Sequence, residues 1–458
     1  ASTGDWPIAR LTATLSGHEQ FRAKGDIHIA RAPGRLDVMG GIADYTGSRV
    51  CQMPLAIAAA AAVQKRSDSQ FYCQSMQVGR SLAIPVRQIV SSDALALRSQ
   101  MTGQDTWARY IVGCLWWLAR HDPALPVHEG LSVLVDSDVP LGGGVSSSAA
   151  IEVATMTAMA SLLGVTLSPM QLAAACQLVE NQVVGAPCGV MDQVASCMGQ
   201  AGAMLDILCQ HASDGSPAQL LGVIKVPAGY TFIGIHSGVR HEVSGNPYAD
   251  TRVAAFMAHR ILFDHKRLQG PGLHLANLSL DEYVTSLRDL LPAQLSGQAF
   301  LDRWQSSPDS VTTIDPSRFY RVQAAADHHV REMHRVTKFA QLLQSESITQ
   351  DHLRQAGELM IQSHHSYSDN AHQGHELTDR LAAMLREAGP AQGILGHRIT
   401  GGGCGGTVAV LMRDEPACFD LIETIRQRYE RDTGRKTHLF TGSSHGAAAH
   451  GVIIRKGG

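Results

Sequence analysis

A glycine-rich turn followed by three hydroxyl side chains is the part of this sequence best suited to chemistry. Residues 140–150 read PLGGGVSSSAA and lie between an expected strand and an expected helix. Glycines let a backbone approach an anion closely, and the free amides of a helix N-terminus bind one. This order favours a phosphate-binding loop over a plain flexible turn, and without GxxxxGK[ST] the loop is not of the Walker type. Its candidate ligands are Gly142, Gly143, Gly144, Ser146, Ser147 and Ser148.

Three charged residues would complete a phosphoryl-transfer site around such a loop. The reaction needs Mg²⁺ ligands, a group that orients or deprotonates the acceptor hydroxyl, and a cation for developing charge. Ser147 and Glu180 can bind Mg²⁺. Asp192, an acid in the nearly neutral segment APCGVMDQVAS, can act as the base, and Arg35 as the cation. The sequence alone does not bring them together, and each taken singly also fits a surface or capping role.

A second glycine run, TGGGCGG at 400–406, formally fits GxGxxG. A strand follows these glycines, where a dinucleotide-binding fingerprint needs a helix. A tight hairpin and a ligand-binding loop around Gly402 therefore both remain open.

The elements that must position these residues alternate between strand and helix periodicity, which indicates an α+β protein. Trp107 lies on an expected amphipathic helix, and helical spacing favours a core role for it. The stretch 210–227 is rich in Ser, Gly and Ala, so we place a boundary there, between domains 1–220 and 221–458. Strands are expected at 27–30, 54–63, 131–139, 398–400 and 407–412, and helices at 107–120, 147–163, from 169 onward, and near 250–265, 325–344, 351–364, 375–388 and 418–431.

Length and composition support a two-domain globular protein. The chain has 458 residues, 44% of them hydrophobic and 17% charged, with a net charge of −3. Without a broad basic field or a long apolar run, neither nucleic acid nor a membrane is expected as a partner. Nine scattered cysteines with no CxxC pair predict reduced thiols and a cytoplasmic protein.

Four segments in order resemble the motifs of the GHMP kinase superfamily, and within it the galactokinase branch. They are RAPGRLDVMGGIADYTGS, PLGGGVSSSAA, VENQVVGAPCGVMDQ and RITGGGCGGTV. TWARYIVG, SGVRHEVSGNPY and SHHSYSD resemble further galactokinase-like segments. The similarity is greatest to the kinase domain of plant-type L-arabinokinases.

The resemblance implies a fold, two substrates and residue roles. The fold would be an N-terminal ribosomal-protein-S5-like α/β domain and a C-terminal ferredoxin-like α+β domain, with ATP and a sugar at their interface. Asp192 matches the catalytic aspartate and Arg35 its arginine partner. Glycines 142–144 with Ser146 to Ser148 match the phosphate loop, and Ser147 and Glu180 the Mg²⁺ ligands. The remaining matches are Asp44, Gly189, Tyr248 and glycines 401–403 at the pocket and Trp107 near the adenine.

The sugar-binding stretch departs from the galactokinase pattern. The family typically has Gly-Glu-His-Thr-Asp-Tyr, whereas residues 40–45 read Gly-Gly-Ile-Ala-Asp-Tyr. In the family the glutamate and histidine contact the C6 hydroxyl, and Gly41 and Ile42 replace them here. L-arabinopyranose is galactopyranose without the hydroxymethyl group, so a pocket for it has no C6 hydroxyl to bind. The expected activity is therefore an L-arabinose 1-kinase, with galactose, galacturonate or fucose 1-kinases and a non-catalytic sugar sensor as alternatives.

Two other patterns have weaker support. GSSHG at 442–446 matches a G-x-S-x-G nucleophile elbow at Ser444, but the helix that must follow is doubtful. The clusters His328-His329 and His364-His365 invite a zinc interpretation, although no zinc spacing is present and solvated histidines are favoured. A monomer is expected.

Overall fold

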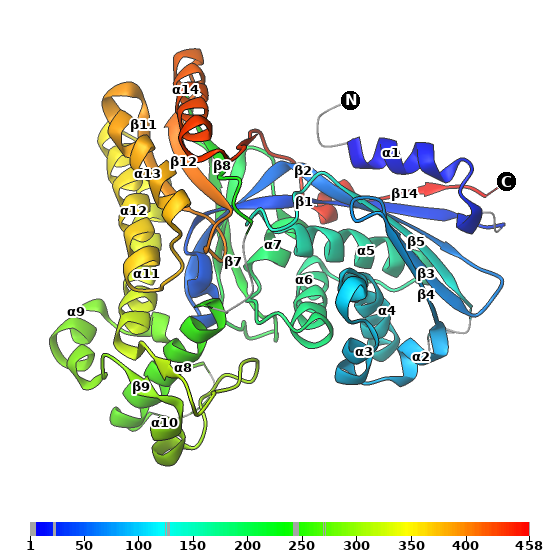
Figure 1. Ribbon diagram of the computed structural model, residues 1–458, viewed down its shortest axis with the longest axis horizontal. Coiled ribbons are helices and arrows are strands. Elements are labelled where there is room, and N and C mark those ends of the chain that lie inside the picture. The colour runs from blue at the N-terminus through cyan, green and yellow to red at the C-terminus, as the bar shows by residue number, and fades with distance from the viewer. Residues whose placement is uncertain are drawn as a thin grey trace.

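Two sheets with their helices lie side by side along the long axis of the protein (Figure 1). The structure is a computed structural model that describes residues 6–21, 24–123, 125, 129–240, 247–268, 270 and 272–457. Within these ranges, no helix is both long and apolar enough to cross a lipid bilayer.

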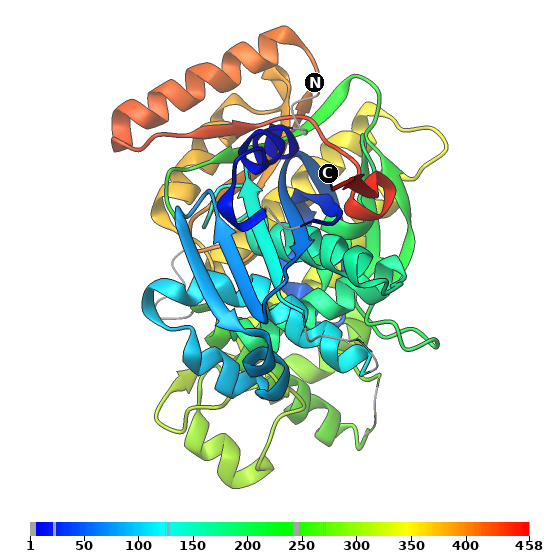
Figure 2. The ribbon, with the colours of Figure 1, turned by 90° about the vertical axis from the view of Figure 1, so that its right-hand side faces the viewer.

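The first sheet has eight strands and is built around two long ones. Its main path is β14-β1-β2-β5-β3-β4, and β6 pairs with the start of β2 and carries β7 at its edge. The central strands are buried almost throughout, because α5 packs against β1 and β2 while α1 lies across β2 and β5 (Figure 2). The strands are β1 (Ile27–Met39), β2 (Arg49–Lys65), β3 (Gln70–Ser75), β4 (Arg80–Pro85), β5 (Leu131–Ser137), β6 (Ala203–Leu208), β7 (Gln219–Lys225) and β14 (Val452–Arg455).

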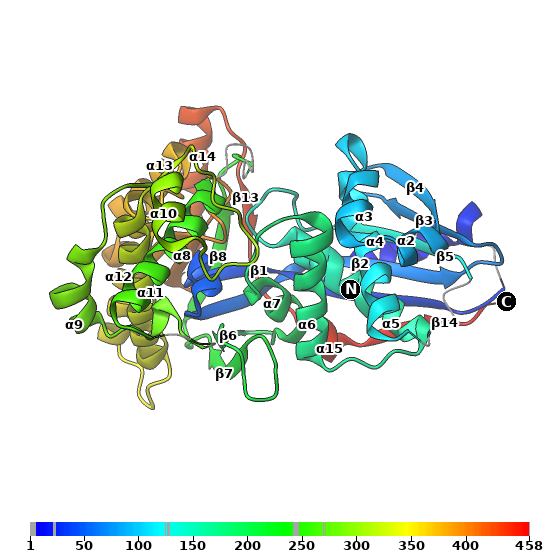
Figure 3. The ribbon, with the colours of Figure 1, turned by 90° about the horizontal axis from the view of Figure 1, so that it is seen from below.

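Most helices of this part lie on one face of the sheet, in front of the strands in Figure 3, while α1 lies on the opposite face (Figure 1). They are α1 (Trp6–Leu15), α2 (Val86–Ser91), α3 (Ala94–Gln100), α4 (Arg109–His121), α5 (Ser147–Leu163), α6 (Pro169–Leu178) and α7 (Met191–Met198). Shorter turns include the 3₁₀ segments η2 (Glu19–Phe21), η3 (Gly41–Thr46) and η4 (Gly103–Ala108) and the π-helical turn η5 (Val179–Val184).

The second sheet is a four-stranded antiparallel one, in the order β11-β12-β8-β13. Its strands are β8 (Tyr230–His236), β11 (Ile394–Ile399), β12 (Thr407–Arg413) and β13 (His438–Phe440). The longer helices of this part are α8 (Pro247–His265), α11 (Val322–Leu343), α12 (Gln350–Asp369), α13 (Glu376–Ala388) and α14 (Pro416–Thr433). Shorter elements are η6 (Leu275–Asn277), α9 (Leu280–Glu282), η7 (Tyr283–Leu287), η8 (Arg288–Leu290), β9 (Leu295–Ser296), α10 (Gly297–Trp304), β10 (Phe319–Tyr320), η9 (Pro390–Gln392) and α15 (Ala447–His450).

The observed elements agree with the α+β expectation and refine several boundaries. The helix expected over 147–163 is α5 with the same bounds. The helix expected over 107–120 begins only at Arg109, so Trp107 lies on η4 before it. The boundary predicted at residue 220 falls inside β7, and the last strand, β14, returns to pair with β1 of the first sheet. Part of the segment 237–248 lies outside the described residues.

Candidate active site

A cavity of about 270 Å³ lies where the glycine turn, η3, η5 and the loop between β11 and β12 meet, and we call it the main pocket. It brings together most of the residues that the sequence singled out. They are Arg35, Ile42, Asp44, Gly142, Gly144, Ser146, Ser147, Ser148, Glu180, Gly189, Asp192, Tyr248 and Gly402.

Asp192 and Arg35 are in direct contact in this pocket. Arg35 lies on β1, just after a register shift in the β1–β2 pairing between Pro33 and Arg35, and Asp192 lies in the first turn of α7. Arg35 Nε and Nη2 both contact Asp192 Oδ1, at 2.8 and 2.7 Å. Among the described residues, Asp192 Oδ2 has no protein partner in hydrogen-bonding distance, and the side chain is 21% exposed. One carboxylate oxygen is thus fixed and the other faces the pocket.

Two side chains hold the glycine turn in place by donating hydrogen bonds to its carbonyl groups. Arg35 Nη1 donates to the carbonyl of Gly144 at 2.8 Å, and Thr407 Oγ1 donates to the carbonyl of Gly143 at 2.7 Å. Ser146, before the first residue of α5, has a left-handed backbone with φ 66°. Its buried hydroxyl has no partner within the described part of the chain. A helix N-terminus with an unpartnered hydroxyl suits an anion.

Glu180 is a buried carboxylate beside this turn, on the π-helical η5. Gln193 Nε2 donates to its Oε2 at 2.7 Å. Burial, together with nearby Asp192, raises the pKa of Glu180 to about 7. A cation next to Glu180 and Ser147 would relieve the cost of holding these acids close together. A carboxylate and a hydroxyl also suit Mg²⁺, which is usually bound through one or two carboxylates and the phosphates of its substrate.

Asp44 closes the other end of the pocket. Its Oδ1 is buried with no partner within the described residues, and the amide of Met191 lies 3.4 Å from Oδ2. A Cβ built on Gly189 would overlap this carboxylate, so glycine is required there. Burial raises the pKa of Asp44 to about 7, with a further contribution from Asp192. A carboxylate oxygen without a partner, such as Oδ1, is ready to accept hydrogen bonds from a polyhydroxylated ligand.

Of residues 41 and 42, only the second lines the pocket. The Ile42 side chain lines the pocket, whereas Gly41 lies behind the wall with φ +48° and donates its amide to Asp37 Oδ1 at 3.1 Å. A bare glycine and an apolar side chain therefore occupy this corner.

The comparisons with known proteins agree with this geometry. Residues 109–200 match the model of the GHMP kinases N terminal domain, 345–431 the GHMP kinases C terminal model, and 18–65 the galactokinase galactose-binding signature. Galactokinase of Chloroflexus aurantiacus is 30% identical over 93% of this chain and 94% of its own length.

The chain belongs to the GHMP kinase family, in its galactokinase branch.

Two further relatives agree with this assignment. L-arabinokinase of Arabidopsis thaliana is 36% identical over 94% of this chain, and the chain spans about half of its length, 47%. The crystal structure of Lactococcus lactis galactokinase complexed with galactose has the same fold. Its TM-score is 0.75 at 19% identity, with 97% of this chain and 99% of that chain covered. The predicted two-domain GHMP kinase fold is confirmed.

Five residues predicted for the site of this GHMP kinase are not in the wall of the main pocket, namely Gly41, Gly143, Gly401, Gly403 and Trp107. Gly41 and Gly143 lie behind it, as described above. Trp107 packs against the apolar core of the first part, although its buried Nε1 has no partner within the described chain. Its contact with a nucleotide stays a prediction.

Several pocket residues were missed. They are Tyr110, Ala186, Pro187, Cys188, Met191, Pro247 and Cys404. Most are apolar or small, so no chemical signal distinguished them, although Ala186 to Met191 lie in the motif that contains Asp192.

A buried ion pair between β1 and β11 supports two walls of the pocket. Asp37 and Arg398, both fully buried, meet at 2.7 Å between Oδ2 and Nη1. Asp37 also accepts from the amides of Gly41 and Gly401, each at 3.1 Å. One acid thus anchors both the sugar-binding stretch and the second glycine loop. Its position between the apolar Leu36 and Val38 was the signal that could have found it.

A second buried pair holds the segment between η5 and α7. Arg252 on α8 binds Asp309 at 2.8 Å and donates from Nη1 to the carbonyl of Pro187 at 2.9 Å. Its guanidinium also lies 5.0 Å from the ring centre of Tyr45. No pattern in the sequence predicted that residues 187, 252 and 309 would be in contact.

The histidines and Ser444 lie outside the main pocket. His328 and His329 on α11 and His364 on α12 are all buried, so the expectation of solvated histidines is wrong for these three. His329 contacts the hydroxyls of Tyr45 and Thr46 at 3.2 and 3.1 Å. Ser444 Oγ donates to the carbonyl of Leu55 at 2.7 Å and only the four-residue α15 follows, so it forms no nucleophile elbow.

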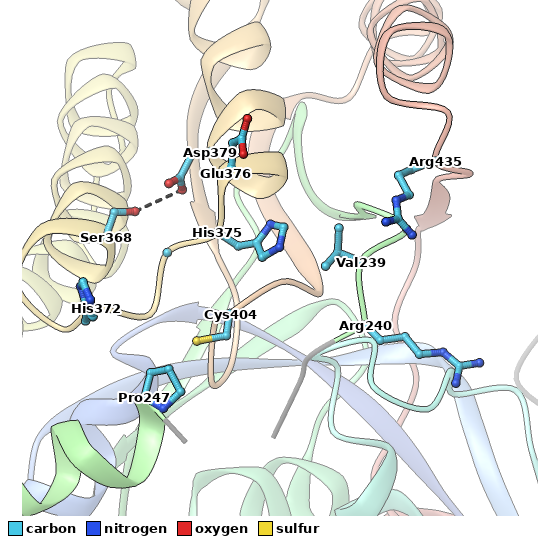
Figure 4. A pocket seen from close by; sticks show the side chains of 12 residues that line it. Val239, Arg240, Pro247, Ser368, His372, His375, Glu376, Asp379, Cys404 and Arg435 are labelled. Atoms are coloured by element: carbon cyan, nitrogen blue, oxygen red, sulfur yellow. Dashed lines mark hydrogen bonds between the residues drawn. The ribbon is translucent and has the colours of Figure 1, made fainter. Parts of the chain in front are cut away.

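A larger, open cavity of about 790 Å³ adjoins the main pocket across Pro247 and Cys404 (Figure 4). Charged side chains of both signs surround it, among them Arg240, Arg435 and Asp379, and Ser368 Oγ donates to Asp379 at 3.1 Å. With both signs mixed, its charge points to no single class of ligand.

Proposed function

We propose that this GHMP kinase transfers the γ-phosphate of ATP to the anomeric hydroxyl of L-arabinose, giving L-arabinose 1-phosphate and ADP. The observation that carries the proposal is the apolar Ile42 side chain in the wall of the same pocket as Asp44 Oδ1, a carboxylate oxygen with no partner among the described residues.

The transfer step is assigned to Asp192 and Arg35. The free Oδ2 of Asp192 accepts the proton of the C1 hydroxyl as the sugar oxygen forms a bond to the γ-phosphorus. The bond from that phosphorus to the bridging oxygen breaks, and ADP leaves. Arg35 fixes the carboxylate through Oδ1 and places positive charge beside the phosphates.

The triphosphate is assigned to the glycine turn and the start of α5. The amides and hydroxyls from Gly142 to Ser148 would bind the phosphate oxygens. Ser147 and Glu180 would hold Mg²⁺, which neutralises phosphate charge when bound. Trp107 is proposed to lie near the adenine.

The choice of sugar rests on a match between the hydroxymethyl group that L-arabinose lacks and the polar side chains that residues 41 and 42 lack. Asp44, beside Gly189, accepts hydrogen bonds from ring hydroxyls, and Tyr248 borders the same space. A hydroxymethyl group would have to share its corner with Ile42, where its hydroxyl would find no polar partner at residues 41 or 42. Burying an unpaired hydroxyl costs about 1–3 kcal/mol, which disfavours galactose by about 5- to 150-fold.

A galactokinase activity is the second candidate, favoured by the match of residues 18–65 to the galactokinase galactose-binding signature. Galacturonate would bury a carboxylate beside the apolar Ile42 and should be a poor substrate. The methyl group of fucose lacks a polar atom, so fucose would be disfavoured only by the volume that Ile42 occupies. A non-catalytic sugar sensor would not need the contact between Arg35 and Asp192.

A coupled ADP-release assay across L-arabinose, galactose, galacturonate and fucose tests the proposal. We expect the highest kcat/KM for L-arabinose. A higher kcat/KM for galactose would establish the second candidate. ADP release with none of the four sugars, despite sugar binding measured by calorimetry, would establish a sensor.

A further inference from the structure

The corner beside Ile42 depends on a residue outside the pocket wall, Tyr367 on α12. This side chain is fully buried and does not line the main pocket. Its hydroxyl accepts a hydrogen bond from the amide of Ile42 at 2.7 Å and donates one to the carbonyl of Gly401 at 2.9 Å. The hydroxyl therefore joins the sugar-binding stretch to the second glycine loop.

The same hydroxyl occupies the space that a side chain at residue 41 would need. A Cβ built on Gly41 would overlap the Tyr367 hydroxyl oxygen, and it would come within 2.9 Å of Asp37 Oδ2. Gly41 also has φ +48°, a backbone conformation that residues other than glycine rarely adopt. No residue larger than glycine fits at 41 while Tyr367 keeps its place.

Tyr367 has little freedom to move away. The guanidinium of Arg398 lies 4.9 Å from its ring centre, and the His328 ring packs edge-on with centres 5.1 Å apart. On its apolar side the ring belongs to a small cluster with Ile42, Ala371 and Ile399. The cluster supports Ile42 from behind and fixes its position in the pocket wall.

We infer that Tyr367 is a specificity-determining residue of this kinase, which acts through Gly41 and Ile42 rather than by touching the sugar. Its hydroxyl keeps residue 41 bare, and its ring and hydrogen bond hold Ile42 against the ligand. The preference between a pentopyranose and a sugar with a hydroxymethyl group is thus a property of three residues. This inference rests on the proposed sugar kinase function and adds the residue that sets its selectivity.

One consequence is that the two family residues cannot be restored alone. Replacing Gly41 by Glu and Ile42 by His should not produce a galactose kinase while Tyr367 remains, because the new glutamate has no room. Removing the Tyr367 hydroxyl and ring end with Tyr367→Leu creates that room.

The experiment compares G41E/I42H, Y367L and G41E/I42H/Y367L with the unaltered protein. The readouts are kcat/KM for L-arabinose and galactose and the thermal midpoint. We expect G41E/I42H to lose activity on both sugars and to unfold at a lower temperature. The triple variant should recover part of the lost thermal midpoint, because the overlap with Tyr367 is removed while the positive φ at residue 41 remains. It should also raise the ratio of galactose to L-arabinose kcat/KM about tenfold or more.

Two single substitutions separate selectivity from simple support of the fold. Tyr367→Phe removes only the hydroxyl, and we expect an increase of about fivefold in the KM for the sugar with little change in kcat or in the KM for ATP. Tyr283→Phe is the matched control, because Tyr283 is also fully buried and donates its hydroxyl to Asp327 at 3.1 Å, within another core cluster. It should lower the thermal midpoint without changing the sugar ratio.

The inference is overturned if G41E/I42H is folded and active with Tyr367 in place, or if Tyr367→Phe and Tyr367→Leu leave the sugar ratio and the sugar KM unchanged. The differences in thermal midpoint among the variants at residues 41, 42 and 367 are measured without any substrate. A failure of the proposed function, such as a preference of the unaltered protein for galactose, is therefore seen separately from a failure of this inference.

Discussion

Asp37 and Arg398 form a fully buried ion pair that joins the strand β1 to the strand β11 of the other sheet. The carboxylate also receives the amides of Gly41 and Gly401 and the side-chain amide of Gln52, the last at 2.6 Å. The two stretches that border the sugar pocket are thus fixed to one another through a single acid.

Replacing Arg398 by Met should destabilise the protein by about 3–5 kcal/mol, because it leaves Asp37 charged and uncompensated in the interior. Urea unfolding followed by far-UV circular dichroism measures the change. Arg428→Met is the control, since the Arg428–Glu387 pair is 51% and 63% exposed and should contribute less than about 1 kcal/mol. Equal losses in the two variants would contradict the structural role of the buried pair.

Asp192→Asn should reduce kcat about 10²- to 10⁴-fold, because the amide cannot accept the proton of the sugar hydroxyl. The thermal midpoint should fall only modestly, since Asn Oδ1 can still accept from the buried Arg35, which also keeps its bond to the Gly144 carbonyl. Asp289→Asn, at a side chain 94% exposed, serves as the control and should retain full activity. Full turnover by the Asp192 variant would remove this residue from the mechanism.

The affinity for the sugar should depend on pH through Asp44. Its pKa is raised from 3.8 to about 7, so the carboxylate that accepts hydrogen bonds is lost as pH falls through 7. At saturating MgATP, the KM for the sugar should increase as the pH is lowered from 8 to 6. The Asp44→Asn variant should have a high KM that does not change with pH.

The same shift predicts a pH-dependent stability of the sugar-free protein. The folded state keeps a proton on Asp44 that the unfolded chain releases between about pH 4 and 7, so this group lowers stability as pH rises through that window. Asp44→Asn should therefore raise the thermal midpoint more at pH 8 than at pH 5. An equal change at both pH values would argue against the raised pKa.

Gly189→Ala should weaken sugar binding, because the new methyl group would displace the Asp44 carboxylate. We expect a sugar KM at least about tenfold higher, comparable to the loss of one charged hydrogen bond. Gly222→Ala is the matched control, since the nearest atom to its Cβ would be Gln344 Nε2 at 3.9 Å. Similar KM values for the two variants would show that Asp44 does not need the bare backbone at 189.

Local patterns were sufficient to predict the elements that carry the glycine turn at residues 140–150. The glycines and hydroxyls before α5 signal a turn and a helix start within a few residues, so the helix bounds agree with the structure. The second glycine loop is a hairpin between β11 and β12 and also borders the pocket at Gly402, so the two interpretations were compatible.

Long-range support could not be predicted in the same way. Tyr367 lies 325 residues from the amide that it binds, and nothing in SHHSYSD indicates that its hydroxyl excludes a side chain at Gly41. His329 appeared polar enough to be solvated, yet α11 buries it beneath η3, where Tyr45 and Thr46 supply its partners. Such residues are defined by packing between distant segments, which periodicity and composition do not encode.

The pairing of β14 with β1 has a consequence for synthesis on the ribosome. Ile27 pairs with Arg455, and the edge of the first sheet is covered only when that last strand arrives. Most strands of this sheet leave the exit tunnel early. The edge at β1 stays unpaired until the second half of the chain, which ends in β14, has been synthesised. We therefore expect nascent chains of this kinase to expose an unpaired β1 edge until residues 452–455 have been synthesised and to depend on chaperones during that interval.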